Sequence, residues 1–483
     1  MLKRLSYASA VPMLMMLVAM VMKPAWRDEF WTLYLTDATG SVRPFSIERL
    51  HLDQGHPPLY AMVMHLWRFV SSTEIWARSF SLVVMIAGAL VVRRLWRGRP
   101  ELAWFLLMCA GSYWIVYFAT EIRSYVLLFV LCAISVVVAA RALEDRQNTV
   151  MWAAVWCSLG IALGLTHYFG ALWVACLGLC VGLMHLQRKS VLGFGAWGLA
   201  SALALVPVAL WISASFQSST PDAIFADSEG GAGSAFAGGA EQFLRGLFVK
   251  LIGSNVALAV AAGIGASALF RRCEPVDAVL LGACILTVVI SFALQVFWIP
   301  LVKERSFIVI MPALIFIGAR AITGIGEDWR WGRRAIQAAP YVAAITPFLF
   351  IPEYFKDREV LGEVATFMRE RSEGCSGAPV VAFFRGGKEL EGLHRWVSER
   401  AIKPAVPDGS APPVLINAET MEPGSAAHLV SGCKIRAVAF VMPRNAGPEH
   451  ERAKAALRRA GVPIDTLEER RFGKMRQLVY TVR

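Results

Sequence analysis

Apolar residues fall into long runs that recur along roughly the first three quarters of the chain. A helix needs roughly 20 such residues to cross about 30 Å of hydrocarbon, and the runs approach this length. They lack the strict alternation of apolar and polar positions that a barrel strand requires, so the pattern predicts membrane-spanning helices. About eleven spans are predicted, at residues 5–22, 75–92, 102–120, 124–140, 150–165, 171–187, 191–215, 251–270, 278–299, 307–322 and 335–351.

Two apolar segments at the start of the chain need a separate interpretation. Residues 5–22 could form a signal peptide, but the uncharged stretch is long and no small-residue cleavage site precedes Trp26, which favours an anchor. Residues 56–70 are interrupted by His65 and Arg68 and are short for a span. They predict a helix that lies at the membrane interface.

The chain after residue 352 is charged and punctuated by proline and glycine, as soluble domains are. Strands are predicted at residues 380–384, 414–417, 437–442 and 477–482, and helices at residues 359–371, 390–399 and 449–460. The predicted fold is therefore a polytopic α-helical membrane domain over residues 1–352, followed by a soluble α/β domain over residues 353–483. No Gly-rich phosphate motif or nucleophile motif occurs in the second domain, so we assign it no chemistry.

Composition agrees with a bilayer as the solvent. The 483 residues are 56% hydrophobic and 17% charged, with a mean hydropathy of +0.52. The net charge of +12 could suggest a protein that binds nucleic acid, but most of the excess lies in short loops between apolar runs. Membrane topology explains this placement, and we predict no nucleic-acid partner.

Lysine and arginine gather in alternate loops, and basic residues beside membrane helices are retained in the cytoplasm. The cytoplasmic set is Lys3, Arg4, Arg93, Arg94, Arg97, Arg99, Arg141, Arg146, Arg188, Lys189, Arg271, Arg272, Arg330, Arg333 and Arg334. The outward set comprises loops 23–74, 121–123, 166–170, 216–245 and 300–306 and everything after residue 352. The N-terminus is thus predicted inside and the C-terminal domain outside.

Cysteine usage fits this sidedness. Seven of the nine cysteines lie in predicted spans or beside cytoplasmic basic clusters, where packed, reduced thiols are expected. The other two, Cys375 and Cys433, lie in the outward domain, where an oxidising compartment would let them form a disulfide. Two free thiols are the alternative, because the sequence does not give the distance between them.

Two segments of the first outward loop carry chemically useful side chains. The sequence Trp26-Arg27-Asp28-Glu29-Phe30-Trp31 places adjacent carboxylates among aromatic residues where the first span leaves the membrane. An exposed acidic pair is ordinarily solvated and idle, but partial burial of like charges raises a carboxylate pKa toward useful base strength. The second segment runs from His51 to Tyr60, and its two prolines after His56 fix a turn that presents Asp53 and His56.

Four motifs taken in order resemble one family. They are the acidic pair after the first span, His-Pro-Pro-Leu-Tyr at 56–60, Arg-Ser-Tyr at 123–125 and Thr-His-Tyr-Phe-Gly at 166–170. Together they resemble the GT-C membrane glycosyltransferases, in the branch that contains protein O-mannosyltransferases and lipid A aminoarabinose transferases. The resemblance covers roughly the first 325 residues. The order of the motifs is more specific than any single motif.

The resemblance implies an inverting transfer of a sugar from a polyprenyl-phosphate donor to a hydroxyl acceptor outside a bacterial inner membrane. Asp28 matches the position of the catalytic carboxylate in that family, with Glu29 beside it. A carboxylate is useful there because a hydroxyl attacks only when a base accepts its proton. The leaving phosphate needs cations. The candidate donor-site residues are Arg123, Tyr125, His167, Tyr168, Lys303 and Arg305, and the candidates for an acceptor or sugar pocket are Asp53, His56 and Tyr60.

Each of these assignments has a plainer alternative. Arg123 could simply extend to the lipid headgroups, and Lys303 and Arg305 could anchor anionic lipid. A divalent metal site can be drawn from His51, His56, Asp53 and Glu29, but the first loop holds no Asp-x-Asp triplet, so metal-independent transfer is predicted.

Other functions stay open at this point. The acceptor could be a glycan, a lipid or a protein, and loop 216–245 is either a plain linker or a lid over the donor. A transporter or flippase would also have many spans, although the central spans here are nearly free of charge and show no repeat. The third hypothesis is an envelope assembly subunit whose outward domain binds a partner.

Overall fold

The computed structural model describes residues 13–23, 27–37, 45–51, 56–217, 274–297 and 304–325, five short strands after residue 379, and a few single residues. The chain divides into two compact units. The first comprises Met1–Met22 and Phe45–Tyr354, and the second comprises Lys23–Pro44 and Phe355–Arg483. Each unit is described by itself.

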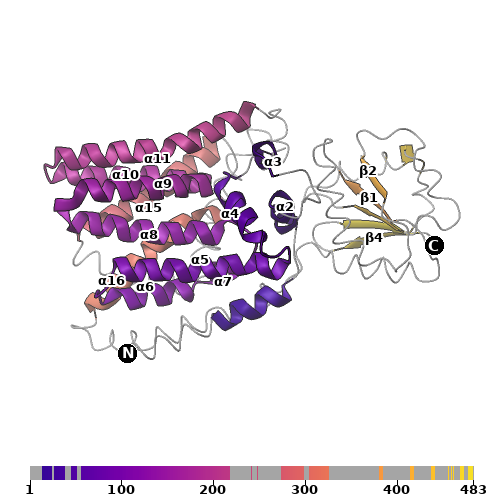
Figure 1. Ribbon diagram of the computed structural model, residues 1–483, viewed down its shortest axis with the longest axis horizontal. Coiled ribbons are helices and arrows are strands. Elements are labelled where there is room, and N and C mark those ends of the chain that lie inside the picture. The colour runs from indigo at the N-terminus through magenta and orange to yellow at the C-terminus, as the bar shows by residue number, and fades with distance from the viewer. Residues whose placement is uncertain are drawn as a thin grey trace. The chain divides into compact units, whose positions relative to one another are not determined.

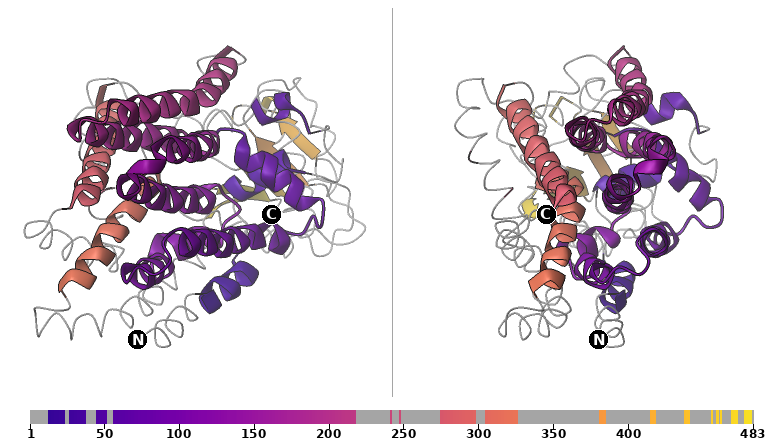
Figure 2. Two further views of the ribbon diagram at one scale, coloured as in Figure 1. Left: turned by 60° about the vertical axis from the view of Figure 1, so that its left-hand side comes forward. Right: turned by 90° about the vertical axis from the view of Figure 1, so that its left-hand side faces the viewer.

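The first unit is a bundle whose long helices run side by side (Figure 1). Its helices are Met13–Met22, α3 (Ile47–His51), α4 (Leu59–Arg68), α5 (Glu74–Leu95), α6 (Glu101–Ala110), α7 (Tyr113–Ala119), α8 (Tyr125–Glu144), α9 (Thr149–Thr166), α10 (Tyr168–Gln187), α11 (Val191–Gln217), α15 (Pro275–Phe297) and α16 (Met311–Ile325). Two 3-10 helices, η1 (Arg146–Asn148) and η3 (Glu304–Val309), precede α9 and α16. The view along the helices shows α15 and α16 on one side of the bundle (Figure 2).

Six helices among the described residues are long and apolar enough to cross a membrane, so the chain is an integral membrane protein. They are Glu74–Leu95, Tyr125–Glu144, Arg146–Thr166, Tyr168–Gln187, Val191–Ser215 and Pro275–Gln295, and each matches a predicted span. Predicted spans 251–270 and 335–351 lie outside the described residues, as does the first half of span 5–22. The total of about eleven spans therefore stays a prediction.

The third predicted span, at 102–120, is not one continuous helix. It consists of α6 and α7, which are bent by 57° at a short break. Gly111 ends α6, where its amide donates to the Leu107 carbonyl at 2.8 Å, and Ser112 then takes an extended conformation with ψ 125°. Neither residue interrupts the apolar pattern in a way that a hydropathy profile detects, because a bend changes direction without adding charge.

The tenth predicted span, at 307–322, also differs in its start. The chain forms η3 first, and the α-helix begins at Met311. Pro312 follows immediately, and proline is accommodated in the first turn of a helix, where its missing N–H has no partner to lose. The proline therefore fixes the start of α16.

The predicted interfacial helix at 56–70 is present as α4, which follows the two prolines and is too short to span a bilayer. A reciprocal contact joins its end to α5: Trp67 Nε1 donates to the Trp76 carbonyl at 2.9 Å, and Trp76 Nε1 donates to the Trp67 carbonyl at 2.8 Å. The two indoles are stacked, with centroids 4.7 Å apart and planes 5° from parallel. We call this contact the tryptophan clasp.

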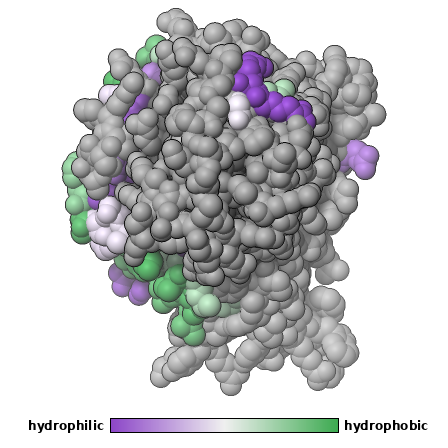
Figure 3. Space-filling model, turned by 90° about the vertical axis from the view of Figure 1, so that its right-hand side faces the viewer, coloured by the Kyte–Doolittle hydropathy of each residue, from purple (hydrophilic) through white to green (hydrophobic). Residues whose placement is uncertain are grey.

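Helix α8 lies in the core of the bundle, where 78% of its apolar 18-residue stretch is buried. Indole groups satisfy the few hydroxyls between neighbouring helices: Trp173 Nε1 donates to Ser135 Oγ, and Trp156 Nε1 donates to Ser201 Oγ, both at 2.9 Å. Apolar side chains such as Leu199 and Leu210 remain exposed on the outer helices, as expected for a lipid-facing surface. A space-filling view shows both hydrophobic and hydrophilic areas among the described residues of one face (Figure 3).

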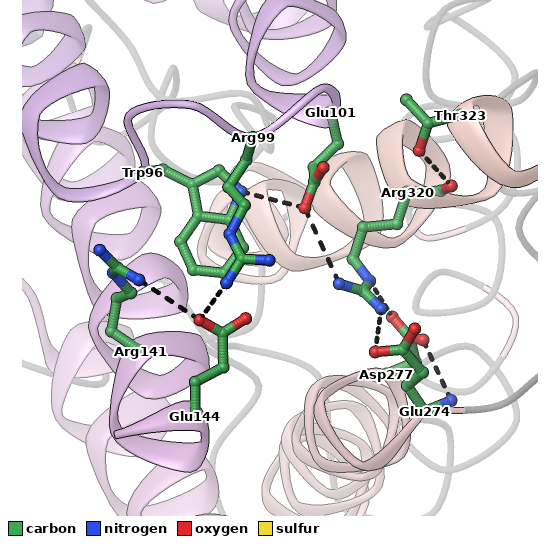
Figure 4. Close-up of polar contacts among 9 residues, drawn as sticks. All are labelled: Trp96, Arg99, Glu101, Arg141, Glu144, Glu274, Asp277, Arg320 and Thr323. Atoms are coloured by element: carbon green, nitrogen blue, oxygen red, sulfur yellow. Dashed lines mark hydrogen bonds and ion pairs between the residues drawn. The ribbon is translucent and has the colours of Figure 1, made fainter.

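One end of the bundle is crossed by a network of charged side chains (Figure 4). Arg99 and Arg141 both pair with Glu144. Arg320 pairs with Asp277 at 3.0 Å, with Glu274 at 2.6 Å and with Glu101 at 3.8 Å, which ties α16 to α15 and α6. The basic loops that the sequence assigns to one side of the membrane thus meet at one end of the bundle where they are described, and we call this the basic end.

Replacing Arg320 with glutamine is expected to lower the free energy of unfolding by about 3–5 kcal/mol, because it leaves buried carboxylates without their cation. The side chains of Asp277 and Glu101 are only 9% and 7% exposed. Thermal unfolding of the detergent-purified protein measures the change. Arg99→Gln is the matched control: the side chains of its pair are 42% and 36% exposed, so the expected loss is about 0–1 kcal/mol. Equal losses in the two variants would contradict the prediction.

The second unit contains α2 (Arg27–Leu35) and a five-stranded sheet in the order β2-β1-β3-β5-β4. Its strands are β1 (Val380–Phe384), β2 (Val414–Asn417), β3 (Ala437–Phe440), β4 (Glu468–Phe472) and β5 (Gln477–Thr481). Strand β1 pairs in parallel with β2 and β3, whereas β5 is antiparallel to β3 and β4. Four strands lie where the sequence predicts them. The fifth, β4, has the polar sequence EERRF, which gives no apolar alternation.

The helices predicted in this part of the chain, at 359–371, 390–399 and 449–460, lie almost entirely outside the described residues. The α/β class of the C-terminal domain and its location outside the membrane therefore stay predictions. Parallel strands need crossover connections, which are most often helical, so the parallel pairing of β1 with its neighbours agrees with the predicted class.

Candidate functional site

Arg123 lies in the short turn between α7 and α8, at the end of the bundle opposite the basic end. Main-chain hydrogen bonds from Thr120 and Glu121 to the carbonyls of α7 hold this turn. The Arg123 side chain is only 6% exposed. This burial does not fit an arginine that merely extends to the lipid headgroups, which was the plainer interpretation of the sequence.

His56 contacts Arg123 across 66 intervening residues: its Nε2 lies 3.3 Å from Nη2 of the guanidinium. A guanidinium only donates hydrogen bonds, so the imidazole nitrogen is the acceptor in this contact. The position of His56 follows from local sequence, because Pro57 and Pro58 fix the turn that leads into α4. The motif predicts His56 in an acceptor or sugar pocket, and the structure adds its contact with the proposed phosphate-binding residue.

His167 is the N-cap of α10, with extended backbone angles and a side chain whose Nδ1 accepts a hydrogen bond from the Phe169 amide at 3.2 Å. Capping by the imidazole satisfies a helix-terminal N–H and fixes the ring. The ring lies edge-on to His56, with centroids 5.4 Å apart and planes at 81°. It also lies 5.8 Å from the ring of Tyr125.

Tyr125 begins α8 and is almost fully buried, with 1% exposed. Its ring packs against Phe118, with centroids 4.4 Å apart. Arg305, on η3, places its guanidinium carbon 5.5 Å from the centre of the same ring, which is a cation–π distance. Tyr125 therefore joins the second cationic candidate to the group around Arg123.

The result is a set of contacts among five residues that are far apart in the sequence: His56, Arg123, Tyr125, His167 and Arg305. Four separate segments of the first unit supply them. Two guanidinium groups and two imidazoles in a largely buried setting offer the hydrogen-bond donors and positive charge that a phosphate requires. We call this group the cationic site.

The other predicted site residues have different outcomes. Tyr60 is buried on α4, where its described contact is with Phe80 on α5, and Tyr168 is half-buried at the start of α10. Glu29 is fully buried on α2. The side chain of Asp28, and all of Asp53, Lys303, Cys375 and Cys433, lie outside the described residues. Because α2 belongs to the second unit, the expected approach of Asp28 to Arg123 stays a prediction.

Glu121 is a candidate that the sequence motifs did not single out. It lies in the same turn as Arg123, and its side chain is 0% exposed. A carboxylate this deeply buried needs partners, and the turn places it two residues from a guanidinium. An acidic residue in a turn of only a few residues was the available signal, but a single acid in a loop is too common to be chosen on that ground.

His51 does not share the contacts of His56. Its ring stacks on Trp211, with centroids 4.2 Å apart, and its Nδ1 lies 3.1 Å from Ser215 Oγ on α11. Within the described ranges, no group of three or more His, Cys, Asp or Glu side chains is arranged to hold a metal ion. Independence from a metal stays a prediction, since Asp53 falls outside those ranges.

The described cysteines behave as the sequence suggests. Cys109, Cys132, Cys157, Cys176, Cys180 and Cys284 are free thiols. All lie in apolar helices of the first unit, where a packed thiol acts as a small apolar side chain.

The described helices define a polytopic membrane protein. The crystal structure of ArnT from Cupriavidus metallidurans bound to undecaprenyl phosphate is similar, with a TM-score of 0.55 and 14% identity, and the match covers 98% of this chain and 97% of that one. The same protein in its apo state gives a TM-score of 0.53 at 13% identity, with the same coverage. An oligosaccharyltransferase from Archaeoglobus fulgidus gives 0.48 at 11% identity, covering 99% of this chain and 73% of that one.

The predicted resemblance to GT-C transferases is thus confirmed at the level of the fold. No family model matches the sequence. No curated protein matches it either.

Proposed function

We propose that this protein transfers a sugar from a polyprenyl-phosphate donor to a hydroxyl acceptor at the end of the bundle that carries the cationic site. The observation that supports the proposal most is the convergence of Arg123, His56, His167 and Arg305 at one membrane end. The likeness to ArnT, whose crystal structure holds undecaprenyl phosphate, supports a lipid phosphate as the group that binds there.

In this proposal the acceptor oxygen attacks the anomeric carbon of the sugar as the bond from that carbon to the phosphate oxygen breaks. The electron pair of the broken bond goes to the phosphate, which leaves as polyprenyl phosphate. Arg123 and Arg305 stabilise the negative charge that develops on the phosphate, because fixed donors in a site of low exposure cost no reorganisation. A single displacement inverts the configuration at the anomeric carbon.

The acceptor proton needs a base, and the proposal assigns it to Asp28, with Glu29 beside it. Both lie in the first turn of α2. An ionised carboxylate can accept the hydroxyl proton in the transition state. Asp53 and Tyr60 are proposed to line the acceptor or sugar pocket.

The cationic site is proposed to face outward, with the basic end in the cytoplasm of a bacterial inner membrane. Arginines and lysines concentrate at the basic end, as expected for the cytoplasmic side. The lipid donor would then reach the site from the outer leaflet, and the acceptor would be an envelope glycan, lipid or protein. The C-terminal domain would lie on the same outward side.

The test is an assay of the full-length protein in liposomes with a panel of radiolabelled polyprenyl-phosphate monosaccharides and a mixture of envelope glycolipid and peptide acceptors. Release of polyprenyl phosphate, with transfer of the labelled sugar to an acceptor and inversion at the anomeric carbon of that sugar, is the expected result. Movement of intact donor across the bilayer without its consumption would identify a flippase instead. Binding of envelope proteins with neither transport nor transfer would identify an assembly subunit.

A further inference from the structure

The basic end of the bundle contains two kinds of cation. Arg99, Arg141 and Arg320 each pair with carboxylates (Figure 4). Others, among them Arg146, Arg188 and Lys189, have no carboxylate within ion-pair distance in the described part of the chain. These three come from the two adjacent turns that link α8 to α9 and α10 to α11.

Arg188 reaches from the end of α10 to the end of α8, where its Nη1 donates to the Leu143 carbonyl at 2.9 Å. This contact carries its guanidinium to the turn that contains Arg146. Partial burial, followed by the positive charge of Arg146, lowers the pKa of Arg188. Because Arg188 bonds to Leu143, three residues before Arg146, the two arginines bring like charges to the same part of the basic end.

The carboxylate next to Arg146 in the sequence does not relieve this repulsion. Asp145 accepts hydrogen bonds from Asn148 Nδ2 at 2.9 Å and from Trp152 Nε1 at 3.2 Å. These two contacts, in that order, lower the pKa of Asp145, so it stays ionised but is engaged within its own turn and α9. Glu144 is likewise engaged, by Arg99 and Arg141.

Lys189 adds a third cation at a backbone position that disfavours it. Its φ is +61°, in the left-handed region where a glycine commonly ends a helix. Gly98 takes such a conformation in the turn between α5 and α6. A lysine at this position keeps a positive charge beside Arg188 despite the backbone strain.

His185 lies three residues before Arg188, on the same face of α10. It is buried, and its Nε2 has no hydrogen-bond partner among the described residues.

We propose that Arg146, Arg188 and Lys189 form a binding site for the phosphodiester headgroup of an anionic phospholipid. A headgroup phosphate between the turns would offset the repulsion of the two arginines through charge-assisted hydrogen bonds. The membrane leaflet on the cytoplasmic side supplies anionic lipid at high local concentration, and basic clusters between membrane helices suit it. The site lies one helix length from the cationic site, since α8 has 20 residues and runs about 30 Å between them. Lipid binding here is therefore separate from transfer.

The test uses the full-length protein in detergent and titrates phosphatidylglycerol while native mass spectrometry counts the lipid retained. Arg146→Gln, Arg188→Gln and Lys189→Gly are each expected to weaken phosphatidylglycerol binding about tenfold, the effect of losing one charged hydrogen bond. Lys189→Gly removes the backbone strain, so it is expected to melt no lower than the wild type. Arg146→Gln breaks no described side-chain contact, which keeps the test valid if Arg188→Gln folds poorly.

Arg97→Gln is the matched control, because it removes one exposed cation from the turn between α5 and α6 at the same end. It is expected to change phosphatidylglycerol binding by less than about twofold in physiological salt, where distant exposed charges are screened. Equal weakening by all four substitutions would overturn the site in favour of general attraction. Equal retention of phosphatidylcholine, or equally tight binding of inorganic phosphate alone, would overturn the assignment to an anionic lipid.

Discussion

Replacing Asp28 with asparagine is expected to lower the rate of sugar transfer by about 10³-fold or more, with expression and membrane insertion unchanged. A general base contributes roughly 10²–10⁴-fold, and an amide cannot accept the proton. Asparagine has nearly the same shape as aspartate, so the fold should tolerate it. Initial rates of label transfer at saturating donor and acceptor measure the effect. An active Asp28→Asn variant would remove Asp28 as the base.

Glu29→Gln is the matched comparison, because Glu29 is the carboxylate next to Asp28 in the sequence. Consecutive residues on a helix point about 100° apart, and the Glu29 side chain is fully buried on α2. A buried carboxylate is expected to contribute to stability through its partners rather than to meet an acceptor. Glu29→Gln should therefore lower the melting temperature more than the transfer rate. The reverse pattern, with Glu29→Gln inactive and Asp28→Asn active, would exchange the two roles.

Replacing Arg123 with alanine is expected to lower kcat/KM for the lipid donor by about 10²–10³-fold, the loss seen when one preorganised donor to a developing anion is removed. Arg123→Lys should recover only part of the activity, because lysine keeps the charge but lacks the planar fork of donors. The measurement is the initial rate as a function of donor concentration, at fixed acceptor concentration.

A second buried arginine provides the control for Arg123. Arg78 on α5 is 2% exposed and donates to the Met20 carbonyl at 3.1 Å, so it holds two helices of the bundle together. Arg78→Gln is expected to lower stability while the surviving folded protein keeps its donor kinetics. Unchanged donor kinetics in Arg123→Ala, or the same kinetic defect in Arg78→Gln, would contradict a phosphate-binding role for Arg123.

The sequence predicted the membrane helices well because length and apolarity are the only requirements for crossing a bilayer. It missed the bend at Gly111 and Ser112, since hydropathy does not register direction. It also missed β4, whose strand is polar and is stabilised by pairing with β5 rather than by an apolar face.

The residues of the cationic site were named from motifs, but their contacts were not. Nothing in the spacing of His56 and Arg123 shows that their side chains meet. They are brought together because α4 packs against α5 and α9, and both of those helices pack against α8. The pairing of Tyr125 with Arg305 likewise depends on where η3 returns along the bundle. Glu121 was overlooked because burial, which distinguishes it, is a property of the folded chain.

The tryptophan clasp has a consequence for how the protein behaves in different bilayers. Both indoles donate to main-chain carbonyls, so the orientation of α4 relative to α5 is set by contacts within the protein and not by the lipids around it. Membranes of different thickness make helices tilt, and a surface helix held only by lipid would follow that change. Here His56 directly precedes a short helix that is hydrogen-bonded to its neighbour, so the contact between His56 and Arg123 should be kept when the acyl chains lengthen or shorten.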